Sequence, residues 1–179
     1  FTLQDSQVVG NSDDGVEFDT VTATDVTFKG DTIAENGDDG VFITDSDVSD
    51  LVIQNSYLGA TSTLKGNGGN GFDAFNATIT GAAFLDSFFN ENGFDGIDFD
   101  TTTITSGSVT FDNGTPQTLT TGFTLQNSQA LGNDFQGVLQ FDSDVADVTF
   151  KNAILADNRE DGLFIVGTEV VLSAGDPTP

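Results

Sequence analysis

The chain has 179 residues, with 4 Lys plus Arg against 29 Asp plus Glu, a formal net charge of −25, and no His or Cys. This charge argues against nucleic-acid binding and against docking on anionic lipid, because both need cations on the protein. Without His and Cys there is no Ser-His-Asp or Cys-His catalysis, no disulfide, and no imidazole or thiolate metal site. Only oxygen ligands remain, which suit calcium. No apolar run is long enough to cross a membrane, so we expect no membrane insertion.

Short runs rich in β-branched and aromatic residues recur along the chain, and helix-favouring residues are scarce. Each run leads to the string Asn-x-x-x-Gly, which occurs six times in comparable settings. After each Gly, positions +1 and +3 are apolar in every case but Gln140. This alternation predicts a strand with one buried face. The six strings begin and end at Asn11 and Gly15, Asn36 and Gly40, Asn67 and Gly71, Asn92 and Gly96, Asn133 and Gly137, and Asn158 and Gly162.

The repeating unit is 25 residues long, with insertions near 59–64 and 105–121. One such unit cannot bury its own apolar face, whereas stacked units form a continuous core, so the pattern predicts an all-β solenoid. Motifs near residues 1 and 26 return 122 residues later, which indicates a duplicated block. We predict a single domain over 1–172 of about six coils, which begin near residues 1, 26, 51, 82, 123 and 148.

Two segments depart from the repeat. Residues 105–121 contain Asn113-Gly114 between β-rich runs, which predicts a hairpin arm that projects from the stack. Residues 173–179 contain proline where a further strand would begin, and proline stops strand pairing. We therefore predict a terminal edge or a linker there.

The Asn-x-x-x-Gly string with its alternating strand resembles the right-handed parallel β-helix repeats of the pectate-lyase-like superfamily, over nearly all of residues 1–172. The resemblance implies a right-handed parallel β-helix. It leaves activity open, because the superfamily contains lyases, polygalacturonases, alginate epimerases, tailspikes and non-catalytic surface adhesins. The Gly-His-Gly and Arg-x-Lys segments of polygalacturonases are missing. The chain has no His, and its only Tyr, Tyr57, lies at an insertion. We therefore predict that the chain is not an enzyme.

The repeated Asn and Gly are predicted to be structural. Asn side chains at one coil position can stack and hydrogen-bond as a ladder, and Gly supplies a backbone conformation that a side chain would hinder.

Acidic residues gather just before the glycines and on the strands that follow them. Like charges in adjacent coils repel by about 1 kcal/mol per pair in water. A solvated acidic face and a bound calcium ion would each relieve this repulsion, and both remain open. We predict no catalytic residue and no required cofactor, because repeated acids on an exposed face have no reason for a raised pKa. The candidate calcium ligands are Asp13, Asp14, Asp38, Asp39, Asp95, Asp98, Asp100 and Asp161.

Outward positions become apolar in the last two coils. An exposed apolar patch of this kind often marks a partner surface. Two alternatives stay open: an insertion or neighbouring module could cover it, or the fifth coil could shift its register by one residue around Gln140. The predicted interface comprises Leu139, Phe141, Phe164 and Val166.

Taken together, these features predict a non-catalytic structural segment of a secreted bacterial surface or matrix protein, such as an adhesin or fibre shaft, located outside the cell or on its surface. Open coil ends are unpaired strand edges, which favour head-to-tail addition of copies of the chain or of further repeats. The alternative is a polysaccharide-binding or polysaccharide-modifying β-helix with lyase-like or epimerase-like chemistry and an extracellular glycan as partner. The Tyr57–Lys65 insertion is then the place to look.

Overall fold

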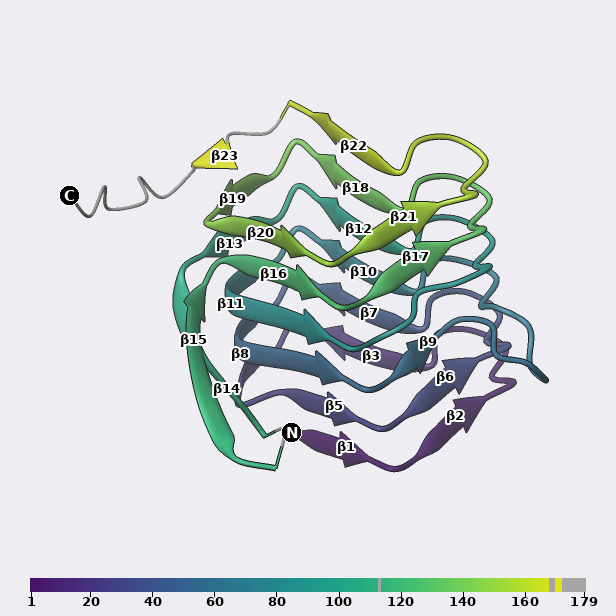
Figure 1. Ribbon diagram of the computed structural model, residues 1–179, viewed down its shortest axis with the longest axis horizontal. Coiled ribbons are helices and arrows are strands. Elements are labelled where there is room, and N and C mark those ends of the chain that lie inside the picture. The colour runs from purple at the N-terminus through teal and green to yellow at the C-terminus, as the bar shows by residue number, and fades with distance from the viewer. Residues whose placement is uncertain (113, 168–169, 172–179) are drawn as a thin grey trace.

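The computed structural model describes residues 1–112, 114–167 and 170–171. The regular elements of this part are strands, and nearly all of them pair in parallel with strands of the coil before and the coil after, a coil being one full turn of the chain (Figure 1). The fold is a right-handed parallel β-helix, which confirms the predicted fold class. Within the described residues, no helix has the length and apolar character needed to cross a membrane.

The stack of coils has three faces. The first face is a sheet of β1 (Thr2–Gln4), β4 (Thr22–Thr24), β5 (Thr27–Lys29), β8 (Asp47–Gln54), β11 (Thr78–Leu85), β13 (Thr103–Thr105), β16 (Phe123–Gln126), β19 (Asp144–Ala146), β20 (Val148–Lys151) and β23 (Val170–Val171). The second face comprises β2 (Gln7–Val9), β6 (Thr32–Ala34), β9 (Tyr57–Leu58), β17 (Gln129–Leu131) and β21 (Ile154–Ala156), linked through single bridges at Phe88. The third face is a sheet of β3 (Val16–Asp19), β7 (Val41–Thr44), β10 (Phe72–Phe75), β12 (Ile97–Asp100), β18 (Val138–Phe141) and β22 (Leu163–Val166).

The register of the third face follows the repeat of the sequence. Phe72 pairs with Val41 on one side and with Ile97 on the other, although six more residues separate it from Val41 than the repeat requires. The extra residues lie in the connection between β9 and β10, and the strands on both sides keep their register. Insertions are therefore accommodated at the corners without disturbing the stack.

Phenylalanine fills the centre of the stack. Phe72, Phe84, Phe99 and Phe123 are fully buried. Their rings pack edge to face, with centroids 4.9 Å apart for Phe72 and Phe84 and 5.0 Å apart for Phe99 and Phe123. Such pairs add stabilisation beyond the apolar area that they bury. One continuous core thus runs along the described coils.

Many of the corners between faces use left-handed backbone at residues other than glycine. Most of these residues are Asp or Asn, whose short polar side chains tolerate this region better than other side chains do. Part of the acidic composition therefore reflects corner geometry. The Asp and Asn residues concerned are Asp5, Asp25, Asp45, Asp50, Asn55, Asn76, Asp86, Asn127, Asp142, Asp147, Asn152 and Asp157.

The hairpin of β14 (Gly107–Asp112) and β15 (Pro116–Thr121) does not project from the stack. It lies along the outside of the first face, against β8 and β11 (Figure 1). Val109 is fully buried there and packs in a cluster with Val52, Ala83 and Leu85. The prediction of a projecting arm is wrong because these outward side chains are apolar and the hairpin covers them. Residue 113 and the predicted edge or linker at 173–179 lie outside the described residues.

Candidate functional site

The six repeated asparagines form one ladder along the corner before the third face. At each step the backbone N–H and the Nδ2 of one Asn donate to the Oδ1 of the Asn in the next coil, over 2.9–3.3 Å. From the second Asn onward, Nδ2 also donates to a backbone carbonyl near the end of the second face. These side chains satisfy backbone groups in the turn. They occupy positions Asn11, Asn36, Asn67, Asn92, Asn133 and Asn158.

The glycine of each string allows a close approach between coils. A Cβ at Gly96 would lie 2.7 Å from the carbonyl oxygen of Gly137, and one at Gly40 would lie 2.5 Å from that of Gly71. The same holds at Gly15 and Gly137, whereas a Cβ at Gly162 would lie 3.0 Å from the nearest oxygen. None of the six glycines has a positive φ. The reason for glycine is therefore the neighbouring carbonyl, and the expectation of a special backbone conformation is wrong.

A second ladder runs one residue before the glycines. Asp14 Oδ1 accepts a hydrogen bond from Asp39 N at 2.9 Å, and Asp39 Oδ1 accepts one from Asn70 N at 2.5 Å. Asn70 Oδ1 accepts from Asp95 N at 2.7 Å, and Asp95 Oδ1 accepts from Gln136 N at 2.5 Å. Asn70 and Gln136 were not among the predicted site residues, although their position in the repeat, directly before Gly, was a usable signal.

Asp73 and Asp98 form an acidic pair on the outer surface of the third face. They are register partners on β10 and β12. The next partners are Phe42 beyond Asp73 and Leu139 beyond Asp98. The Oδ1 atom of each carboxyl is buried and has no hydrogen-bond partner within residues 1–112, 114–167 and 170–171. Two half-covered carboxyl groups thus lie side by side between apolar neighbours.

Burial raises the pKa of both members of this pair. The pKa of Asp98 rises to about 8, first because burial penalises the charged form and then because Asp95, Asp100 and Asp39 are negative neighbours. Burial also raises the pKa of Asp73, and the charges of Asp98 and Asp39 add to the effect. The premise that these acids have no reason for a raised pKa is therefore wrong. Their register partners Phe42 and Leu139 are apolar and offer them no hydrogen bond.

The ladder carboxyls beside the pair are affected in the same direction. Burial raises the pKa of Asp39, although the hydrogen bond from Asn70 N opposes the rise. Burial raises the pKa of Asp95 to about 6 against the hydrogen bond from Gln136 N, and the charge of Glu160 adds to the rise. At pH 7 the protein is therefore less negative here than its composition indicates.

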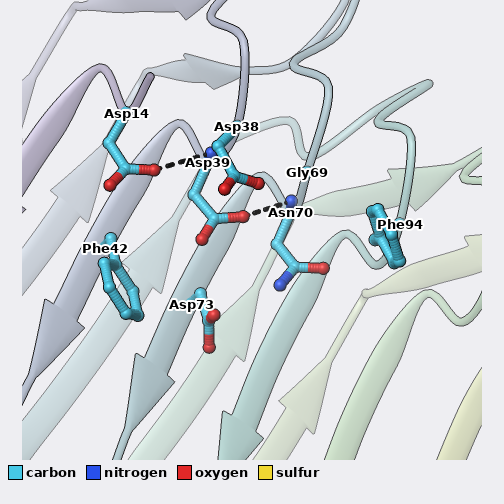
Figure 2. A pocket seen from close by; sticks show the side chains of 8 residues that line it. All are labelled: Asp14, Asp38, Asp39, Phe42, Gly69, Asn70, Asp73 and Phe94. Atoms are coloured by element: carbon cyan, nitrogen blue, oxygen red, sulfur yellow. Dashed lines mark hydrogen bonds between the residues drawn. The ribbon is translucent and has the colours of Figure 1, made fainter.

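An open pocket of about 280 Å³ adjoins the acidic pair. Figure 2 shows Asp39 between Asp14 and Asn70 across the pocket, Asp73 at the start of the strand below, and the rings of Phe42 and Phe94 on opposite sides. Carboxyl groups thus line a hollow with an aromatic ring at each side. The lining residues are Asp14, Asp38, Asp39, Phe42, Gly69, Asn70, Asp73 and Phe94.

Only three of the eight candidate calcium ligands meet as a group in the described structure. Asp13, Asp14 and Asp38 each place a carboxylate oxygen within 4.8 Å of the other two. Asp39 and Asp95 each accept a hydrogen bond from a backbone N–H in the second ladder. Asp98 is the register partner of Asp73, and Asp100 accepts a hydrogen bond from the Thr101 hydroxyl at 2.7 Å. Asp161 is exposed. Calcium takes six to eight oxygen ligands, so water would supply the remainder at the three-residue group. Calcium binding stays a prediction.

The predicted apolar interface lies on the same surface as the acidic pair. Leu139 and Phe141 on β18 are the register partners of Asp98 and Asp100. Phe164 and Val166 on β22 continue the two rows and are exposed. Phe75, the partner of Asp100 on the other side, is also exposed. We call this surface the acid–aromatic face; it comprises Phe42, Asp73, Phe75, Asp98, Asp100, Leu139, Phe141, Phe164 and Val166.

Several solved structures resemble the chain at low identity. The mannuronan C-5 epimerase AlgE6 A-module of Azotobacter vinelandii is 14% identical, with a TM-score of 0.39, over 99% of this chain and 58% of that one. The AlgE4 A-module of the same organism is 13% identical, with a TM-score of 0.33, over 96% and 55%. The catalytic domain of a GH87 α-1,3-glucanase in complex with nigerose is 12% identical, with a TM-score of 0.25, over 92% and 50%. The chain thus spans little more than half of the two epimerase modules.

The prediction that the chain is not an enzyme is contradicted. Epimerase modules and glucanase catalytic domains are among the β-helices that the chain resembles. At these identities the likeness concerns the fold alone. The raised pKa of Asp98 also removes the premise on which catalytic residues were not expected among the repeated acids.

A search of curated proteins finds no match to the sequence. The family described as the right-handed β-helix region matches residues 2–174, which is nearly the whole chain. The parallel pairing of strands in successive coils and the Asn ladder agree with this match. The chain belongs to the right-handed β-helix family.

Proposed function

We propose that the chain binds a polysaccharide along the acid–aromatic face and that Asp73 and Asp98 perform acid–base chemistry on the bound glycan. The observation that carries the proposal is the pair of neighbouring carboxyl groups with buried, unpartnered Oδ1 atoms between apolar register partners. A location outside the cell, where polysaccharides are plentiful, stays a prediction.

The chemistry follows from the protonation of the pair. A carboxyl group with a pKa near 8, as at Asp98, keeps its proton at pH 7 and can donate it to a glycosidic or hydroxyl oxygen. Two carboxyl groups on adjacent strands lie about 4.8 Å apart at their backbones, and their interaction holds one proton more tightly than the other. Near pH 8 Asp98 begins to lose its proton while Asp73, whose pKa rises to about 9, keeps its own, so the pair can divide the roles of base and acid there.

The rest of the face supplies a binding surface. Phe75, Phe141 and Phe164 are exposed around the acids. Binding sites commonly combine aromatic surface for contact area with a few polar groups for orientation. Carboxyl groups that keep their protons also repel an acidic glycan less than carboxylates would.

The test is a binding and turnover assay on soluble neutral glucans and mannans, alginate and polygalacturonate. We expect one of these polymers to bind the wild type, and Asp98→Asn to lower its turnover by about 100-fold or more. Asp157→Asn is the matched control, because it makes the same side-chain substitution at an exposed corner. Equal turnover in the two variants, or no binding to any of these polymers, would contradict the proposal.

A second candidate function is a shaft built by head-to-tail stacking of copies. The Asn ladder has a direction: Asn11 Oδ1 lacks a donor among the described residues, and the backbone N–H of Asn158 lacks an acceptor there. The two ends are complementary in this respect. At the end of the stack that carries Asn158, Ile165 lies in the same inward-facing row as Phe99 and is 41% exposed.

The shaft is tested by electron microscopy and by concentration-dependent light scattering of the purified chain. If coil ends dock, Ile165→Glu abolishes association and Phe164→Glu, a neighbour that is 39% exposed but points outward, leaves it unchanged. Monomers at every concentration, or an equal effect of both variants, would refute end-to-end docking.

A further inference from the structure

An aromatic pair lies on the second face, away from the acid–aromatic face. The rings of Tyr57 and Phe88 stack with centroids 4.6 Å apart and planes 10° apart. In the row along this face, Thr32 is the register partner of Tyr57 on the side opposite Phe88, and Gln7 is the partner of Thr32. Phe88 therefore covers one face of the Tyr57 ring, while the short Thr32 side chain leaves room at the other.

A pocket of about 360 Å³ occupies this room. Tyr57 is 37% exposed and forms part of its wall. Among the residues that the structure describes, no charged side chain lines the pocket, although the chain as a whole carries a net charge of −25. The lining consists of amide, hydroxyl, aromatic and one aliphatic side chain: Gln7, Thr32, Tyr57, Thr61, Ser62, Thr63 and Leu64.

The inserted loop that forms the far wall is ordered by its own hydrogen bonds. Thr61 Oγ1 accepts from Thr63 N at 3.2 Å and from Leu64 N at 3.1 Å, and Thr61 N donates to Leu64 O at 3.0 Å. The backbone N–H of Lys65 donates to Glu35 Oε1 at 3.2 Å, which ties the loop to the preceding coil. The wall is thus formed before any ligand arrives, which lowers the entropic cost of binding.

We propose that this pocket binds a neutral sugar unit, whose apolar C–H face packs on the open side of Tyr57. The hydroxyls of Thr32 and Thr63 and the amide of Gln7 each donate and accept hydrogen bonds, as sugar hydroxyls do. An ionic ligand would find no opposite charge in the lining, and a wholly apolar ligand would leave these polar groups unpaired. The volume lies within the range of small-molecule sites.

This inference rests on its own residues and does not depend on the chemistry of Asp73 and Asp98. A polysaccharide bound here would lie on the second face, across the corner that carries the Asn ladder from the acid–aromatic face. The two sites can therefore fail separately.

The experiment uses Tyr57 as the reporter. It is the only Tyr in a chain without Trp, so its emission reports this site alone. We expect saturable changes in emission on titration with neutral hexasaccharides of glucose, mannose or galactose. Hexauronates and proline-rich peptides serve as comparison probes. No change with the neutral sugars, or a stronger response to either comparison probe, would overturn the proposal.

Variants separate binding from folding. Thr32→Val keeps the branched shape and the reporter but removes a hydroxyl, and we expect it to weaken affinity about 2–10-fold. Thr22→Val, an exposed strand threonine of the first face, is the matched control and should leave affinity unchanged. Tyr57→Phe should keep binding and Tyr57→Ala should lose it, both measured by calorimetry after thermal unfolding has verified the fold. Equal affinities for Thr32→Val and Thr22→Val, or unaltered binding by Tyr57→Ala, would refute the site.

Discussion

Aspartate has three different roles in this chain. At corners such as Asp45 it adopts the left-handed backbone. In the second ladder, as at Asp39, it accepts a backbone hydrogen bond from the next coil. At Asp98 the side chain lies half covered on the outer surface of β12, and the pKa of its carboxyl group is raised. One residue type therefore serves the turn, the stack and the candidate site.

The raised pKa of Asp98 predicts how stability depends on pH. The folded state keeps a proton that the unfolded state releases near pH 4, so the free energy of unfolding falls as pH rises from about 4 to about 8. Asp98→Asn removes this loss. We expect the free energy of unfolding of the variant at pH 9, measured with denaturant, to exceed that of the wild type by at least about 1.4 kcal/mol, the equivalent of one pKa unit. An unchanged pH dependence would show that Asp98 titrates normally.

The Asn ladder predicts a stability difference along the stack. Asn92 is buried, accepts from two donors of Asn67, and donates to Leu58 and Asn133. Asn92→Ala leaves these groups unpaired, and we expect it to cost about 2–4 kcal/mol in unfolding free energy. Asn158→Ala, at the half-buried end of the ladder, should cost less than half as much because water can replace its bonds. Equal costs would contradict a role that depends on burial.

At the scale of elements, the sequence allowed the strands of the third face, the period and the inward rows to be predicted. The alternation after each Gly is a local signal, and Val41, Phe72 and Ile97 were found where it placed them. The position of the hairpin could not be predicted, because it depends on which apolar side chains of β8 and β11 face outward in the folded stack. The shielding of Asp73 and Asp98 was missed for the same reason: it arises from neighbours in other coils.

The hairpin packing predicts a local opening. Val109→Asp places a charge in the cluster with Val52, Ala83 and Leu85, which is unfavourable unless the hairpin detaches. We expect hydrogen exchange in 107–112 and 116–121 to rise at least about 10-fold, while the Asn ladder stays protected. Thr110→Asp, one position along and exposed, is the control. Similar exchange in both variants would mean that Val109 does not hold the hairpin.

At the scale of the whole molecule, the net charge of −25 is spread over corners, ladders and one outer face. Asp13, Asp14 and Asp38 form the group best placed for a cation. If calcium binds there, millimolar calcium at constant ionic strength raises the Tm of the wild type more than that of Asp38→Asn, and Asp157→Asn behaves as the wild type. An equal rise in all three would indicate general screening of charge.

In the proposed function, Asp73 and Asp98 contact a bound glycan while Asp98 holds its proton. Carboxyl-carbon NMR titration tests it most directly, in the free protein and with the polymer selected by the binding assay. We expect Asp98 to titrate near pH 8 and both resonances to shift when the glycan is added. Titration of both groups near pH 4, or carboxyl-carbon resonances that do not shift when the glycan binds, would contradict the proposed function.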